Sequence, residues 1–141
     1  MALYLHNTLS RSVEPFIPLD ASGQSVGMYC CGPTVHDFAH IGNFRTFVFA
    51  DLVRRYLEFR GYQVNHVMNI TDVEDKIIRR VREQSTTLAE YTAKYTDAFF
   101  EDLQTLNCVE PHHIPKATNY IPEMIDLITR LIERGIAYQA Q

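Results

Sequence analysis

The chain has 141 residues and a formal net charge of −4, and 46% of its residues are hydrophobic. This length suits about one globular domain with a core of its own, and no run approaches the ~18 apolar residues of a membrane span. The beginning of the chain lacks the basic segment and long apolar run of a secretory signal, so we expect a cytoplasmic protein without a membrane segment. The acidic net charge offers no overall attraction for nucleic acid.

The first part of the chain predicts two strands. Apolar residues at Leu3, Leu5 and Leu9 predict a short leading strand over residues 3–9. A proline-containing stretch and an Asp-Ala-Ser-Gly turn then predict a polar hairpin. This hairpin leads into Val26–Cys31, which is apolar, β-prone and the stronger of the two strands.

Residues 44–68 predict a helix followed by a second strong strand. Gly61 stands where the helix would end, and residues 62–68 contain β-formers that alternate in part. Strand, helix and strand then form a βαβ unit, and its ligand crevice would lie where Cys31 and residues 69–72 leave the parallel strands. The helical residues that recur at steps of three and four are Phe44, Phe47, Val48, Asp51, Leu52, Arg55, Tyr56 and Phe59.

The remaining residues predict mainly helices. A short helix over 72–82 is acidic in its first turn and basic later. Thr87 and Glu90 form a capping-box pattern that opens a helix to Leu106, and we assign its aromatic residues to the core rather than to a base-stacking platform. Residues 107–115 predict a loop. A helix over 122–133, ended by Gly135, would then precede a new strand over 136–138.

The segment Cys31–Asn43 carries the strongest functional signal. It sets a thiol, a Gly-Pro bend and a His-Ile-Gly-Asn cluster directly before the helix. Backbone N–H groups at a helix start are unpaired and carry partial positive charge, so phosphate is favoured there. The pattern alone leaves two interpretations open, because many strand-loop-helix joints in α/β proteins bind nothing.

The run His40-Ile-Gly-Asn43 resembles the His-Ile-Gly-His signature of class I aminoacyl-tRNA synthetases. The longer runs Met28–Val35 and Asn69–Asp72 are similar to those of cysteinyl-tRNA synthetases, and the resemblance spans nearly the whole chain. It implies an α/β fold in which residues 1–82 form the first half of a Rossmann-like class I catalytic domain, a parallel sheet with helices. Residues 83–141 would be the helical start of the connective insertion that splits the sheet.

The resemblance also implies an ATP site at the helix start, where His40 and Asn43 would be catalytic residues that hold phosphate. Asn43 departs from the class pattern, which has a second histidine, and an amide can donate to phosphate but cannot become cationic. Gly32 and Thr71 would line the pocket for the substrate cysteine. ATP would bind with Mg²⁺, and its implied contacts are Pro33, Thr34, His40, Gly42 and Asn43.

By the same resemblance, Cys31 matches a Zn²⁺ ligand whose partners are expected beyond residue 141. A zinc ion would favour the thiolate of cysteine over the hydroxyl of serine. Apart from the family, a cysteine at a strand end is more simply a small buried hydrophobe, and we interpret Cys30 in that way. Three cysteines, an odd number, fit a reducing compartment rather than a disulfide framework.

Several other candidates have simple structural interpretations. His36 and His40 are spaced as a helical metal pair, but Gly32 and Pro33 favour a loop there, and Gly32 can be a plain turn residue. Thr71 or Asp72 can equally cap the following helix. The remaining candidates are His112 and His113, expected to be solvent-exposed, and two clusters more often solvated than bound to RNA: Arg54, Arg55 and Arg60, and Arg79, Arg80 and Arg82.

The implied reaction joins cysteine to tRNA(Cys) through cysteinyl-adenylate, with ATP, L-cysteine and tRNA(Cys) as partners of a full-length protein expected to be a monomer. The chain holds no Lys-Met-Ser-Lys-Ser-like loop and no second half-sheet, so we expect an amino-terminal portion that is inactive alone. Two alternatives stay open. One is the related cysteine ligase of mycothiol synthesis, which joins cysteine to an aminosugar, and the other is a non-catalytic synthetase-like binding module.

Overall fold

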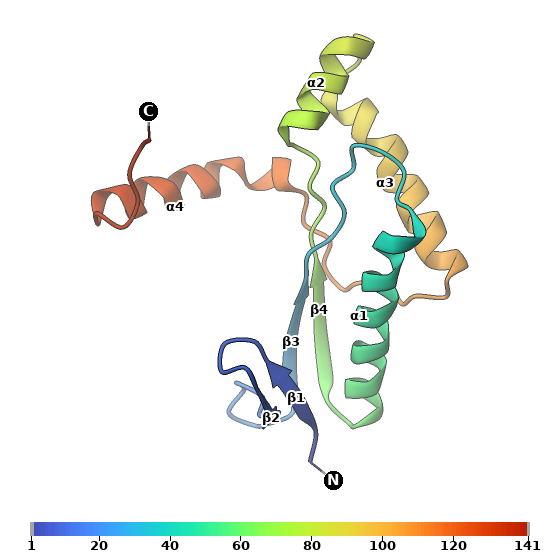
Figure 1. The fold of residues 1–141 in the computed structure, drawn as a ribbon, viewed down its shortest axis with the longest axis vertical. Coiled ribbons are helices and arrows are strands. Elements are labelled where there is room, and N and C mark those ends of the chain that lie inside the picture. The colour runs from blue at the N-terminus through green and yellow to red at the C-terminus, as the bar shows by residue number, and fades with distance from the viewer. Residues whose placement is uncertain (1, 141) are drawn as a thin grey trace.

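The computed structural model describes residues 2–140, and a pair of parallel strands forms its centre (Figure 1). β3 (Ser25–Cys30) and β4 (Gln63–Met68) pair from Ser25 with Gln63 to Cys30 with Met68. α1 (Ile41–Phe59) connects them and packs on β4. The predicted βαβ unit is confirmed. The helix begins earlier than its apolar pattern indicates, because His40 caps it ahead of the first buried residue.

The parallel pairing continues beyond the two strands. Thr34 pairs with Thr71 after β3 and β4 have ended. On the other side of β4, residues 112–117 run parallel to it, and the Ile70 N–H donates to the Pro115 carbonyl at 2.8 Å. The loop predicted for residues 107–115 is confirmed, since these residues form no helix or strand, but the sequence did not indicate their bridges to the β4 segment. Proline is tolerated because this is a sheet edge, where its missing N–H interrupts no ladder.

The core lies where α1 and β4 meet α3 (Leu88–Thr105). The Phe99 ring on α3 stacks on Phe44 with centroids 5.7 Å apart, and it meets Phe47 edge-on at 4.8 Å. Aromatic pairs in these arrangements stabilise a core beyond the area that they bury. Phe99 and Tyr91 are both buried, so the assignment of these two α3 aromatics to the core is confirmed.

The apolar residues that predict α1 are only partly buried. Phe44 and Phe47 are buried, whereas Leu52 is 61% exposed and Phe59 is 83% exposed. The spacing correctly predicts the helix, but it does not reveal which neighbours reach it. Leu52 instead lines a hollow of 750 Å³ along α1.

A separate antiparallel hairpin, β1 (Tyr4–Asn7) and β2 (Ser12–Pro15), lies near the amino ends of the central strands (Figure 1). The Phe16 ring after β2 meets Tyr62, just before β4, edge-on at 5.8 Å. The leading strand is therefore confirmed but shorter than predicted. β2 was not predicted, because Glu14 and Pro15 carry no strand pattern.

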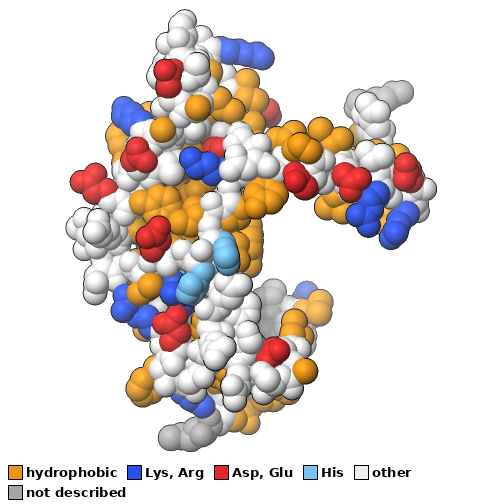
Figure 2. Space-filling model, turned by 180° about the vertical axis from the view of Figure 1, so that it is seen from behind, with side chains coloured by type: hydrophobic (Ala, Val, Ile, Leu, Met, Phe, Trp, Pro, Cys, Tyr) orange, Lys and Arg blue, Asp and Glu red, His pale blue; other side chains and the backbone are white. Residues whose placement is uncertain are grey.

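The carboxyl-terminal half contains α2 (Asp75–Gln84), α3, a 3₁₀ turn η1 (Ala117–Tyr120) and α4 (Ile121–Glu133). The capping box of α3 is confirmed, because Thr87 and Glu90 each accept the other's backbone N–H. α4 stands away from the body as an arm, and none of its residues is buried (Figure 2). Over residues 2–140 the structure contains no helix with both the length and the apolar character to cross a membrane.

The predicted strand over 136–138 is wrong, since these described residues form no strand. Gly135 adopts φ of 67°, which ends α4 as predicted. The Ile136 and Ala137 N–H groups then donate back to the Leu131 carbonyl. The chain thus closes the helix end, and no neighbouring described strand pairs with it.

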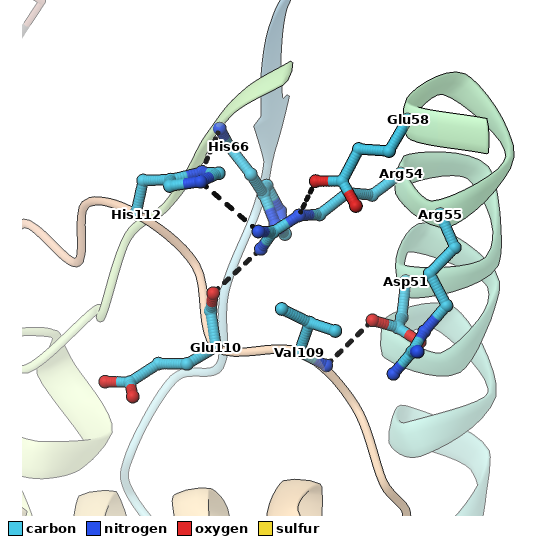
Figure 3. A network of polar contacts seen from close by, with 8 residues as sticks. All are labelled: Asp51, Arg54, Arg55, Glu58, His66, Val109, Glu110 and His112. Carbon is cyan, nitrogen blue, oxygen red and sulfur yellow. Dashed lines mark hydrogen bonds and ion pairs between the residues drawn. The ribbon is translucent and has the colours of Figure 1, made fainter. Parts of the chain in front are cut away.

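Polar side chains of α1 hold the segment that approaches β4 (Figure 3). Arg54 is 5% exposed and donates to the Glu58 carboxylate at 2.8 Å and to the Glu110 carbonyl at 2.7 Å. Asp51 accepts from the Val109 N–H at 2.8 Å. The expectation of a solvated arginine cluster is therefore wrong for Arg54, which holds the segment around Glu110 against α1.

His66 on β4 is the least satisfied group of this network. Its side chain is 4% exposed, and neither ring nitrogen has a hydrogen-bond partner among the described residues. Burial first, then the nearby Arg54 guanidinium and the His112 ring, lower the pKa of His66, and Asp51 and Glu58 oppose them more weakly. The folded state therefore keeps this imidazole neutral.

We expect the chain to lose stability as the pH falls below about 6.5, because the unfolded imidazole takes up a proton near its ordinary pKa of 6.5 while the folded one resists it. His66 contributes a slope of at most ~1.4 kcal/mol per pH unit. His66→Leu should flatten the pH dependence measured by urea unfolding. His6→Gln, on exposed β1, should leave it unchanged, and equal slopes for His66→Leu and the unmodified chain would contradict the assignment.

Candidate active site

The chain leaves β3 through Cys31 and Gly32. Cys31 is exposed, and the Gly32 N–H donates to Asn69 Oδ1 at 3.0 Å. A Cβ atom on Gly32 would stand 1.6 Å from the backbone oxygen of Asn69. The neighbouring backbone leaves room for a hydrogen atom alone, and this explains a glycine at position 32 without a turn requirement or a bound ligand.

The segment that follows β4 lies directly beside this loop (Figure 1). The Thr71 N–H donates to the Pro33 carbonyl at 3.0 Å, and the Val35 N–H donates to the Thr71 carbonyl at 3.1 Å. Thr34 pairs with Thr71 in the same ladder. The predicted meeting of the two segments at the carboxyl ends of the parallel strands is therefore confirmed.

Neither Thr71 nor Asp72 caps the following helix, since α2 begins after Glu74. Thr71 Oγ1 accepts from Asn69 Nδ2 at 3.1 Å. The buried Asp72 carboxylate accepts from the Thr118 N–H at 2.9 Å and from the Thr118 hydroxyl at 2.6 Å, ahead of α4. The capping interpretation of these two residues is wrong, and Asp72 instead fixes the segment that leads to the arm.

His40 and Asn43 together cap α1. His40 Nδ1 accepts from the Gly42 N–H at 3.0 Å, and Asn43 Oδ1 accepts from the His40 N–H at 3.0 Å. A Cβ atom on Gly42 would come within 2.8 Å of the His40 ring, so this glycine makes room for the cap. The Asn43 N–H also donates to the His40 carbonyl at 2.8 Å.

The cap at the start of α1 determines which hydrogen-bond donors are left for an anion. The sequence suggested bare backbone N–H groups at the helix start, but those of Gly42 and Asn43 are already paired. Since His40 Nδ1 is an acceptor, the proton of the neutral ring sits on Nε2, and Asn43 Nδ2 is likewise left as a donor. Both side chains are exposed, and the first turn contains no acidic residue. Side-chain donors are thus available to an anion.

α3 fixes the loop between Gly32 and the helix. The Tyr91 hydroxyl donates to the His36 carbonyl at 2.7 Å, and burial raises the pKa of Tyr91 to about 12, which keeps it protonated. The Phe38 ring meets Tyr95 at 5.0 Å, and Lys94 lies over Phe38. The prediction of a loop from Gly32 to His40, rather than a helix that presents His36 and His40 as a metal pair, is confirmed.

Two hollows adjoin these residues. A cavity of 360 Å³ near the strand ends is lined by Tyr29 and Asn69 together with residues of the 115–124 segment. Gly42 and Arg45 instead line the 750 Å³ hollow along α1. The helix start and the strand ends therefore face different hollows.

The described residues hold no group of three or more His, Cys, Asp or Glu side chains that could bind a metal ion. Cys31 stands alone as an exposed thiol, and residues 2–140 do not complete a zinc site by themselves. Cys30 is half-buried, less than the buried core residue that we expected, and burial, then neighbouring Cys31, raises its thiol pKa. His112 and His113 are exposed as predicted, although His112 Nδ1 also accepts from the His66 N–H at 3.0 Å.

Sequence reasoning missed Asn69 and Tyr29 as site residues. The Tyr29 hydroxyl donates to Asn69 Oδ1 at 2.9 Å, which places one asparagine between β3, Gly32 and Thr71. The available signal was an amide directly after a strand that ends at a predicted crevice.

The model of the family of tRNA synthetases class I (C) catalytic domain matches residues 18–141. The chain belongs to this class I synthetase family. A cysteine–tRNA ligase of Chlamydia pneumoniae is 55% identical over 139 residues, and one of Solibacter usitatus is 56% identical over 131. These alignments cover 99% and 93% of this chain but only 29% and 28% of the relatives. The chain thus spans under a third of the length of these synthetases.

For this synthetase-family chain, we expect Gly32→Ala to lower the free energy of unfolding by about 3 kcal/mol or more, since the added methyl meets backbone that cannot rotate away. Gly27→Ala on β3 is the matched control, because a Cβ there meets nothing within 4 Å. Urea unfolding of both variants provides the comparison. Equal stability of the two would show that the contact with Asn69 does not constrain this position.

Proposed function

We propose that this chain is the ATP- and cysteine-binding part of a cysteine–tRNA ligase. The observation that carries the proposal is the pairing of residues 32–35 with residues 69–71, which brings two separate motif segments to one rim of the sheet. Relatives of that name, 55% and 56% identical to the chain, support the same assignment.

In the proposed reaction, the carboxylate of cysteine attacks the α-phosphate of ATP, and pyrophosphate leaves. The cysteinyl group then passes from the adenylate to a terminal ribose hydroxyl of tRNA(Cys). Such a reaction gains most of its rate from positioning and from stabilisation of charge at phosphate. The residues of this chain would therefore orient the two small substrates.

The ATP site would lie at the start of α1. His40 Nε2 and Asn43 Nδ2 would donate to phosphate, since the cap engages the other polar atom of each side chain. Gly42 would allow nucleotide to approach the helix, and Pro33 and Thr34 would line the site from the paired loop. Mg²⁺ bound to the nucleotide would neutralise phosphate charge.

The cysteine pocket would lie at the rim, lined by Gly32 and Thr71. Cys31, one residue before Gly32 and exposed, would supply one thiolate to a zinc ion. Because the described residues do not complete a zinc site, Cys31 is the single ligand that we propose for this chain.

We propose the same division of the chain as the sequence suggested. Residues 1–82 would form the first half of the class I catalytic sheet with its helices, and residues 83–141 the start of the connective insertion. The complete protein would act in the cytoplasm, as a monomer, and residues 1–141 alone would be inactive.

The complete protein that carries this chain should exchange pyrophosphate into ATP in the presence of cysteine and not of serine. His40→Asn should lower this exchange by roughly a hundredfold, because asparagine still caps the helix but cannot replace the imidazole donor. His6→Asn, on β1, is the control and should be near normal. No cysteine-dependent exchange by the unmodified complete protein would contradict the proposed function.

Zinc content tests the role of Cys31 independently of activity. We expect the complete protein to lose most of its bound zinc on Cys31→Ser, since a serine hydroxyl is a poor substitute for thiolate. Cys30→Ser alters the neighbouring thiol and should leave zinc unchanged. Atomic absorption on purified protein gives the values, and full zinc occupancy in Cys31→Ser would rule out this ligand.

A further inference from the structure

Asn69 has an amide whose orientation its neighbours determine. The Gly32 N–H can only donate, and it points at one atom of the Asn69 side chain at 3.0 Å. That atom must therefore be the carbonyl oxygen. The Tyr29 hydroxyl donates to the same oxygen at 2.9 Å, so two donors hold the amide in one orientation.

The fixed amide in turn controls the Thr71 hydroxyl. Asn69 Nδ2 faces Thr71 Oγ1 at 3.1 Å, and an amide nitrogen can only donate. Thr71 Oγ1 is therefore the acceptor. The backbone of Thr71 is held on both sides, because its N–H donates to Pro33 and its carbonyl accepts from Val35. These bonds fix the backbone from which the Thr71 hydroxyl extends.

The proton of the Thr71 hydroxyl has no acceptor among residues 2–140 in the hydrogen bonds of the structure. Thr71 is half-buried, and Asn69 lines the 360 Å³ cavity together with Tyr29. The network therefore leaves two protons to donate at the rim, that of the Thr71 hydroxyl and the second N–H of Asn69 Nδ2. A group that takes the proton of the hydroxyl must supply an acceptor.

We propose that Asn69, held by Tyr29 and Gly32, is a positioning residue that makes Thr71 a hydrogen-bond donor to the amino-acid substrate. This inference rests on the proposed function of the site. The proton of the Thr71 hydroxyl would go to an acceptor of the substrate, the carboxylate oxygen or thiolate sulfur of the amino acid. In this inference Asn69 acts through Thr71.

Asn69→Asp inverts this polarity with little change of shape. One carboxylate oxygen still accepts from Gly32 and Tyr29, but the other replaces Nδ2 and requires the Thr71 proton for itself. Thr71 then no longer offers a donor to the substrate. In the complete protein, we expect the KM for cysteine in pyrophosphate exchange to rise roughly tenfold or more, with little change in the KM for ATP.

A double-mutant cycle with Thr71→Val separates this effect from simple repulsion by the new charge. If Asn69 acts through Thr71, Asn69→Asp should have little further effect on the KM for cysteine once the hydroxyl is absent. Thr71→Ser retains the hydroxyl and should restore most of the affinity lost in Thr71→Val. Asn65→Asp introduces the same charge at an exposed position of β4 and is the matched control, with a KM near that of the unmodified protein.

Asn69→Ala, which removes the amide without adding charge, undergoes the same cycle and gives the answer if Asn69→Asp folds poorly. An unchanged KM for cysteine, or an equal rise with and without the Thr71 hydroxyl, would overturn the inference alone. No cysteine-dependent exchange by the unmodified protein would overturn the proposed function and this inference with it. The two failures are therefore distinguishable.

Discussion

The close approach of two backbones just beyond the parallel strands is the constraint on which the rest of the site depends. β3 and β4 end at Cys30 and Met68, yet their chains stay paired through Thr34 and Thr71. This continuation brings Gly32 against the Asn69 carbonyl, where a side chain larger than hydrogen does not fit. Backbone hydrogen bonds from Thr71 to Pro33 and from Val35 to Thr71 hold the two segments in this register.

The start of α1 shows how one set of residues serves both the fold and the candidate chemistry. His40, Gly42 and Asn43 form a reciprocal cap, and the glycine is needed for the histidine ring to reach the helix. A helix cap of this kind contributes ~1 kcal/mol to stability. The same cap determines which nitrogen of each side chain is left to donate, so the anion-binding potential belongs to oriented side chains rather than to unpaired backbone.

The sequence predicted the local features and the central parallel pair, but not the burial of individual side chains. The periodic spacing from Phe44 gave α1, the β-formers gave β3 and β4, and Thr87 with Glu90 gave the start of α3, because each signal lies within a few residues. The parallel arrangement also predicted correctly that the segments after β3 and β4 meet. The sequence could not predict that one apolar face of α1 stays exposed, since burial depends on elements distant in sequence.

The same limit explains the missed residues. Arg54 lies in a cluster of arginines that is typical of a protein surface. It is buried because residues 107–112 return to α1, where Arg54 donates to the Glu110 carbonyl. Asn69 was visible as part of a motif, but its role depends on Tyr29 from a different strand. Predictions based on single positions therefore fail where one side chain joins several segments.

Three segments meet at the rim, and two of them pair through their backbones with the third, which follows β4. Residues 32–35 lie on one side of residues 69–71, and residues 113–117 lie on the other. Asp72 then accepts two hydrogen bonds from Thr118, so the third segment is fixed beyond the last strand pair as well. A shift of any one segment would have to break main-chain hydrogen bonds, and this makes the rim a rigid support for polar side chains. Rigid placement is what an adenylate-forming site requires, because positioning supplies a large part of its rate.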